Sequence, residues 1–266
     1  GAQFGAFAEA VARDRWRTFK CEERLRVVNL GGTAVGTGLG APRSYIFLVT
    51  EKLREVTGLG LARAENLVDQ TANADAFVEV AGILSAHASS LIKIASDLRL
   101  LNLFGEIRLP AVQVGSSIMP GKVNPVVCEC VVQAALLALS HASLVAEAVS
   151  RSTLQICEFL PLVSHGLLTS IEILQHADGL FRKHVEQIQA DPDACDRNLS
   201  DSPTLITAFL PQIGYRRAER LIEEFSASGR SDLRAFLSEK LGRDLVDRVL
   251  SGHNLMSLGH RDEDDA

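Results

Sequence analysis

The feature that most constrains the fold is a long periodic stripe in residues 72–102. Residues suited to a helix–helix contact recur there in steps of three and four, at Phe77, Val80, Leu84, His87, Leu91, Ile94, Leu98 and Leu101. This spacing keeps the side chains on one face of an α-helix and turns that face towards a partner helix. Because a long helix needs neighbours to cover such a face, the sequence predicts a helical bundle.

Three other segments also have the pattern of long helices. They cover residues 2–28, 125–150 and 160–188, and the second is apolar on nearly all sides. We expect a shorter helix over 43–56 and another from about Ala62. Runs of β-branched residues are short and strict alternation is rare, so little sheet is expected. The predicted fold class is therefore all-α, a long central helical bundle with a small C-terminal helical domain.

The character of the sequence changes near residues 188–192. Asp191-Pro192 signals a turn, and Asp191 is suited to cap the next helix. Beyond this point the helical segments are shorter and the charge density is higher, and the acidic end of the chain reads as a solvated tail. We therefore predict a central bundle domain over 1–189 and a small helical domain over 190–266.

Composition argues against two classes of protein, those that bind nucleic acid and those that span a membrane. Charged residues make up 23 % of the chain and the net charge is −6, so no basic excess favours nucleic acid as a partner. The longest apolar run, 126–139, is interrupted by Glu129 and Gln133, and we expect no membrane span. No basic stretch followed by an apolar run begins the sequence, and its five cysteines include no CxxC pair. These patterns predict a cytoplasmic protein with reduced thiols and no metal site.

The loop of residues 115–125 contains the residues best suited to chemistry. It reads Gly-Ser-Ser-Ile-Met-Pro-Gly-Lys-Val-Asn-Pro. Asn124 and Pro125 suit the N-cap and first position of the next helix, whose free N–H groups attract an anion. Lys122 adds a full positive charge, so the loop suits a carboxylate. A phosphate-binding loop fits badly, because Val123 stands where a magnesium-binding hydroxyl is needed and no strand precedes the loop.

The same loop resembles the GSSxMPxKxNP signature of the aspartase/fumarase superfamily. Further resemblances are Gln3–Phe7 to the family's GQEFGAF and residues 33–39 to its TAVGTGLN, with close counterparts at 97–101 and 213–215. The Lys-Val-Asn-Pro form is typical of the aspartase and fumarase branch. Residues 125–127 look more like the aspartate ammonia-lyases, whereas Cys128-Glu129 looks more like the fumarases.

The resemblance implies a lyase that eliminates ammonia from L-aspartate, or from a related succinyl compound, and releases fumarate without a cofactor. By the family's pattern Ser116 would be the base that removes a proton from the carbon beside a carboxylate, and Ser117, Lys122 and Asn124 would bind the substrate. The residues expected in supporting roles are Glu129, Gly115, Met119, Thr33 and Thr37. Taken singly, the same side chains are equally suited to loop hydrogen bonds, a helix cap and surface charge.

Two alternatives remain open at this stage. The first is a class II fumarase-type hydratase, and the second is a catalytically incomplete helical scaffold. The family's threonine and histidine segments lie upstream of its GQEFGAF, so we expect them to come from a longer gene product or from a partner. Cys157 and Gly40 replace asparagines of the family pattern. Because family members are homotetramers whose active sites draw on three subunits, we expect a homo-oligomer, a tetramer, that binds a small dicarboxylate.

Overall fold

The computed structural model describes residues 1–257 and residue 259, and the acidic tail predicted from the sequence lies outside them. Helices account for most of the described chain, and the strands are pairs of residues, so the predicted all-α class is confirmed. The chain divides into two compact units. The first contains Gln3–Leu100 and Leu109–Ile188, and the second contains Leu101–Arg108 and the described residues from Gln189 on. The domain limits 1–189 and 190–266 stay a prediction.

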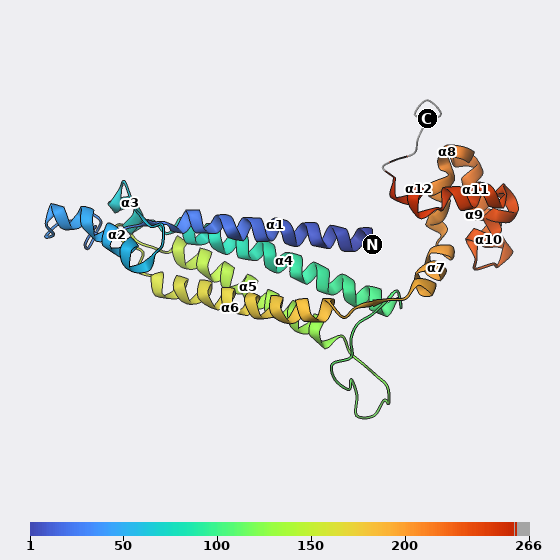
Figure 1. The fold of residues 1–266 in the computed structure, drawn as a ribbon, viewed down its shortest axis with the longest axis horizontal. Helices are drawn as coiled ribbons and strands as arrows, with labels where there is room; N and C mark the ends of the chain where they lie inside the picture. The colour runs from blue at the N-terminus through green and yellow to red at the C-terminus, as the bar shows by residue number, and fades with distance from the viewer. Residues whose placement is uncertain (258, 260–266) are drawn as a thin grey trace. The chain divides into compact units, whose positions relative to one another are not determined.

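Four long helices form the first unit, and Figure 1 shows them running side by side. They are α1 (Ala2–Leu25), α4 (Asp75–Leu103), α5 (Val126–Ser150) and α6 (Leu160–Val185). Within this unit α5 and α6 pack closely along their length. Gly166 allows this approach, because a Cβ at that position would lie 3.0 Å from Cγ2 of Val145.

Short elements cover the end of the bundle where α1 ends and α4 begins (Figure 1). They are β1 (Val27–Val28), α2 (Arg43–Thr57), β2 (Ala62–Arg63) and α3 (Leu67–Ala72). The helix expected from Ala62 begins instead at Leu67, because residues 62–63 pair in parallel with residues 27–28. Asn66 then caps α3, its side chain accepting hydrogen bonds from the backbone N–H groups of Val68 and Asp69.

The glycine-rich loop over residues 30–42 is packed against α3. Gly36 has a φ of +84°, and a Cβ there would lie 2.3 Å from the carbonyl oxygen of Leu67. Both the backbone conformation and the contact therefore require glycine. Thr33 also has a positive φ, +57°, although it is not a glycine. The loop is a structured connection between α1 and α2.

The second unit consists of short helices around its own apolar core. Its elements are β3 (Ile107–Arg108), β4 (Gln189–Ala190), α7 (Pro192–Ser200), the 3-10 helix η1 (Pro203–Phe209), α8 (Leu210–Ile213), α9 (Tyr215–Ser228), α10 (Leu233–Leu241), α11 (Arg243–Val249) and α12 (Gly252–Met256). Strands β3 and β4 pair in antiparallel register. Phe209, Leu233, Leu237 and Val246 are fully buried at its centre. Asp191 caps α7 through a hydrogen bond from the N–H of Ala194, as the turn signal predicts.

Two helices of the first unit are unusually apolar. By length and composition alone, α4 and α5 would be long and apolar enough to cross a membrane, because α5 extends well beyond the run at 126–139. The buried core helices of water-soluble proteins can be equally long and apolar. Only 33 % of the apolar window in each helix is buried within this chain. Each helix therefore has apolar surface available for contacts that the chain alone does not supply.

Candidate active site

The loop of residues 115–125 is closed at its neck by backbone and side-chain hydrogen bonds. The N–H of Gly115 donates to the carbonyl oxygen of Lys122 over 2.7 Å. The side-chain amide of Asn124 donates to the carbonyl oxygen of Gly115 over 3.4 Å. A Cβ at position 115 would lie 2.7 Å from the same Lys122 oxygen. Glycine is therefore required at position 115 because there is no room for a Cβ, and not because the backbone has a positive φ.

Ser116 lies inside the closed loop and is half-buried, whereas Ser117 is exposed. The Ser116 Oγ accepts hydrogen bonds from the backbone N–H of Met119 over 3.0 Å and of Ile118 over 3.2 Å. N–H donors aimed at an oxygen favour its negatively charged form over its neutral form. This serine consequently has an environment suited to developing alkoxide character.

The positively charged part of the loop is Lys122, whose side chain is exposed. Its backbone N–H donates to the carbonyl oxygen of Met119 over 3.3 Å. The predicted cap is wrong in one respect, because Pro125 rather than Asn124 occupies the N-cap of α5 and no side chain caps the helix. The Asn124 amide instead braces the neck of the loop. The free N–H groups at the start of α5 still add positive potential beside Lys122.

Glu129 lies in the first turn of α5, directly after the loop. Its Oε1 is 3.7 Å from the Nη2 of Arg99 on α4, which ties the two helices together at this end of the bundle. Asp97, two residues before Arg99, is paired with Lys93. Side chains two residues apart on a helix point in different directions, whereas those four apart are neighbours. Arg99 lies beside the loop because it pairs with Glu129 on another helix. The spacing of residues along α4 does not predict that pairing.

Cys128 precedes Glu129 and is fully buried. Burial raises the pKa of the Cys128 thiol to about 11, with a smaller increase from the carboxylate of Glu129 and a decrease from the nearby Arg99 guanidinium. The thiol therefore stays protonated, as a structural buried cysteine does, and is not suited to act as a nucleophile.

The structure does not bring Thr33 and Thr37 to the serine loop. Thr33 Oγ1 donates to the carbonyl oxygen of Leu39 over 3.2 Å, and Thr37 Oγ1 accepts from the N–H of Leu39 over 3.4 Å. Both serve the glycine-rich loop, which lies at the opposite end of the first unit (Figure 1). The 25 residues of α5 separate the two ends by about 37 Å at ~1.5 Å per residue.

The two departures from the family pattern lie at that opposite end as well. Cys157 is buried beyond the end of α5, and its sulfur accepts a hydrogen bond from Ser152 Oγ over 2.9 Å. Gly40 has a φ of +83° and open space around its Cβ position. Within residues 1–257 and 259, no group of three or more His, Cys, Asp or Glu side chains is arranged to hold a metal ion.

Comparisons with known proteins indicate the family of this chain. Residues 1–138 match the protein family described as Lyase. The chain is 36 % identical to the aspartate ammonia-lyase of Helicobacter pylori over 97 % of its own length and 56 % of that protein. It is 37 % identical to the Bacillus subtilis aspartate ammonia-lyase over the same shares. The chain thus spans a little over half of the length of the curated relatives that it matches.

Solved structures give the same result. A Brucella melitensis fumarate lyase:delta crystallin bound to cobalt superposes with a TM-score of 0.89 at 36 % identity, covering 97 % of this chain and 57 % of that one. A class II fumarase of Schistosoma mansoni superposes with a TM-score of 0.81 at 26 % identity, covering 94 % and 57 %. With the family match over more than half of its residues, the chain belongs to the lyase family of the aspartase/fumarase superfamily.

Proposed function

We propose that this chain supplies the base and one carboxylate-binding part of a lyase that eliminates ammonia from L-aspartate and releases fumarate. The observation that carries the proposal is the closed loop at residues 115–125, in which two backbone N–H groups point at the Ser116 oxygen. The aspartate ammonia-lyase relatives support L-aspartate as the substrate.

In the proposed reaction the Ser116 oxygen removes a proton from the substrate carbon beside the reacting carboxylate. The electron pair of that C–H bond passes into the carboxylate, which becomes a dianion. The electrons then return to form the C=C bond, and the C–N bond of the substrate's ammonium group breaks with its electron pair going to nitrogen. Neutral ammonia leaves and takes a proton from solvent to become ammonium, and fumarate remains. The proton taken by Ser116 passes to solvent, which restores the base.

The other polar residues of the loop, and Glu129 after it, also have roles in this proposal. Lys122 and the start of α5 place positive charge where the dianion develops, which lowers the barrier most when the donors are fixed in advance. Ser117 holds the substrate from the exposed side of the loop. Asn124 binds the substrate with the face of its amide that does not brace the neck. Glu129, paired with Arg99, holds negative charge at the edge of the site.

A hydratase acting on malate is the second candidate function. It is favoured by the similarity to the class II fumarase structure and uses the same proton abstraction with water as the leaving group. The two reactions share every step assigned to this loop. They differ only in the group that leaves, and that group is recognised by residues that this loop does not contain.

The proposed site also needs more than one copy of the chain. The apolar windows of α4 and α5 are mostly uncovered within the chain, which supports a homo-oligomer, a tetramer. A second copy would also bring its glycine-rich loop, with Thr33 and Thr37, to the serine loop of the first, since the two loops sit at opposite ends of one antiparallel bundle. We further propose a cytoplasmic enzyme that needs no cofactor.

The test is fumarate formation, followed by its absorbance, with protein expressed from the complete coding sequence and supplied with L-aspartate or L-malate. Ser116→Ala is expected to abolish turnover while the oligomer, measured by light scattering, persists. Ser117→Ala should retain turnover at saturating substrate with weaker substrate binding. Turnover of Ser116→Ala at the wild-type rate would remove Ser116 as the base.

A further inference from the structure

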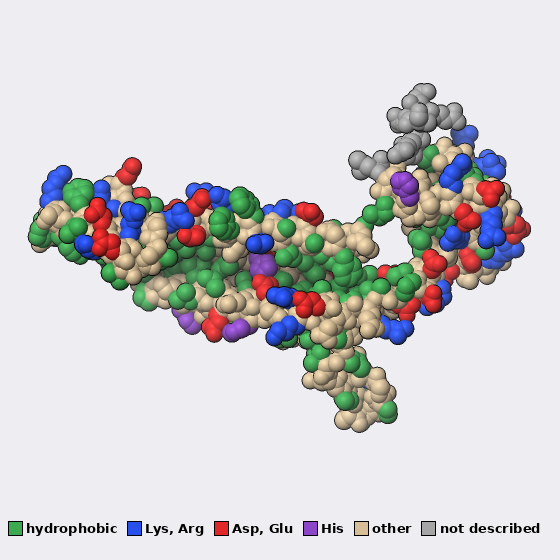
Figure 2. All heavy atoms as spheres, viewed as in Figure 1, with side chains coloured by type: hydrophobic (Ala, Val, Ile, Leu, Met, Phe, Trp, Pro, Cys, Tyr) green, Lys and Arg blue, Asp and Glu red, His purple; other side chains and the backbone are tan. Residues whose placement is uncertain are grey.

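A cavity of about 890 Å³ lies between α1, α4 and α6, away from the serine loop. Its walls are mostly apolar, and Figure 2 shows hydrophobic side chains gathered over the face between α1 and α6. Phe4, Phe7, Leu91, Ile94 and Phe181 are among the side chains that line it. This open groove leaves part of the apolar faces of α1, α4 and α6 uncovered within the described chain.

The buried residues of α1 are Phe7, Asp14 and Cys21, spaced seven apart. Asp14 thus occupies the middle of the contact seam, where only 3 % of its surface is exposed. A buried carboxylate in such a position destabilises the contact unless a cation and hydrogen bonds compensate it. Where it is compensated, a polar residue in a helix seam fixes the register of the two helices.

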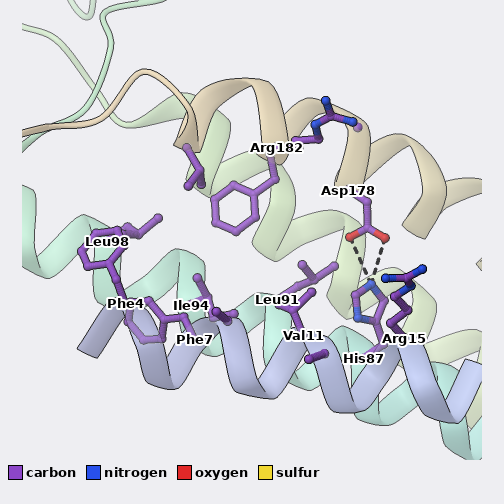
Figure 3. A pocket seen from close by; sticks show the side chains of 15 residues that line it. Phe4, Phe7, Val11, Arg15, His87, Leu91, Ile94, Leu98, Asp178 and Arg182 are labelled. Atoms are coloured by element: carbon purple, nitrogen blue, oxygen red, sulfur yellow. Dashed lines mark hydrogen bonds and ion pairs between the residues drawn. The ribbon is translucent and has the colours of Figure 1, made fainter. Parts of the chain in front are cut away.

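Arg17 on α1 and His87 on α4 share that compensation, each facing one oxygen of the Asp14 carboxylate. Figure 3 shows the His87 ring directed at the Asp178 carboxylate. Its Nε2 lies 3.0 Å from both carboxylate oxygens of Asp178 on α6. Its Nδ1 lies 3.4 Å from Oδ2 of Asp14 on α1. A carboxylate only accepts, and a neutral imidazole has a single N–H. Both contacts are hydrogen bonds at once only when the ring carries two protons.

We propose that doubly protonated His87 is a clamp that fixes the register of α1 on α4 and α6, and that α1 loosens when this proton is lost. The clamp joins three helices through one side chain that is 14 % exposed. The proposal does not depend on the lyase reaction, since none of its residues belongs to the serine loop.

The two carboxylates in contact with the ring favour its protonated form, and three arginines on the same helices lie close by. From α1, Asp14 faces it, with Arg17 Nη1 2.9 Å from the other Asp14 oxygen, and Arg15 lines the same cavity. From α6, Asp178 faces it, and Arg182 lines the cavity while pairing with Glu186.

The hydrogen bond that His87 Nε2 donates to the Asp178 carboxylate is the largest cause that raises the pKa of His87, and burial opposes it. The folded-state pKa therefore lies above the unfolded value of about 6.5. The stabilisation is complete below that unfolded value and is lost as the pH rises through the folded-state pKa.

The experiment compares thermal unfolding of the protein and of His87→Gln from about pH 5.5 to about pH 8.5, the interval in which imidazole titrates. We expect His87→Gln to unfold roughly 3 °C or more below the wild type at the acidic end and to approach it at the alkaline end. Amide exchange, expressed as protection factors to remove the intrinsic pH dependence, should show lower protection around Asp14 in the variant at acidic pH.

Two further variants make the outcome decisive. Asp178→Asn keeps the Asp14 contact and changes a carboxylate that is half exposed, so it tests the clamp even where His87→Gln fails to fold. Arg24→Gln breaks the exposed ion pair to Glu79, 3.0 Å, between the same helices α1 and α4, and should lower stability equally at every pH. A difference between wild type and both clamp variants that does not change with pH would overturn the proposal.

Discussion

Replacing Gly115 with alanine tests whether the neck of the serine loop sets the position of Ser116. The added Cβ would lie 2.7 Å from the carbonyl oxygen of Lys122, against 3.4 Å for ordinary contact, and 3.1 Å from the backbone nitrogen of Asn124. The neighbouring atoms are backbone, so the loop must open by about 0.7 Å. That opening also stretches the 2.7 Å hydrogen bond from Gly115 to Lys122 to about 3.4 Å, which weakens it.

The effect on stability and the effect on activity should differ in size. One exposed backbone hydrogen bond contributes about 1 kcal/mol, so the melting temperature should fall by only about 2–4 °C. A displacement of catalytic groups approaching 1 Å costs roughly a hundredfold in rate, and we expect a loss of that order in kcat/KM for fumarate formation.

Gly121→Ala in the same loop is the matched control. Gly121 has a φ of +80° but open space at its Cβ position, so alanine there costs about 1–2 kcal/mol of backbone strain without a clash at the neck. It should destabilise the protein at least as much as Gly115→Ala and reduce kcat/KM far less. Equal activity losses in the two variants would refute the reasoning that the neck positions the base.

Three further predictions concern the packing around the site and the bundle. Because Cys128 is buried with a pKa of about 11 and Cys130 is exposed, iodoacetamide should alkylate Cys130 in the folded protein and leave Cys128 unmodified by mass spectrometry. Burial lowers the pKa of His184, so its neutral ring contributes stability above about pH 6.5, and this contribution is lost as the pH falls through the folded-state pKa. His184→Phe should therefore lose less stability than the wild type when the pH is lowered, as a plot of unfolding free energy against pH would show. Gly36→Ala, which places a Cβ 2.3 Å from the Leu67 carbonyl oxygen, should lower the denaturant midpoint by an amount equivalent to about 2 kcal/mol or more.

The helical bundle was predictable because its signal is carried by the sequence along each helix. The stripe over residues 72–102 becomes α4, and the apolar segment at 125–150 becomes α5 with nearly the predicted limits. The predicted limits of an element were wrong where a contact with a distant part of the chain sets them. Residues 62–63 become a strand because they pair with residues 27–28, which nothing near Ala62 in the sequence indicates.

The candidate site was predictable only in part. The serine loop is a contiguous motif, and its neck closes between residues that the motif itself contains. The pairing of Arg99 with Glu129 joins two helices and depends on their packing. His87 shows the limit most clearly, since its place in the periodic stripe indicates a core contact, whereas its partners lie on two other helices.

The central claim is that Ser116 moves the proton of a fumarate-releasing elimination, and isotope exchange tests it directly. Protein expressed from its complete coding sequence is incubated with fumarate and ammonium in deuterium oxide, and the products are followed by NMR. The account predicts L-aspartate with a single deuterium on the carbon beside the reacting carboxylate, and none with Ser116→Ala. Deuterated malate in place of aspartate would identify the hydratase instead. Deuterated aspartate formed by Ser116→Ala at the wild-type rate would contradict the account.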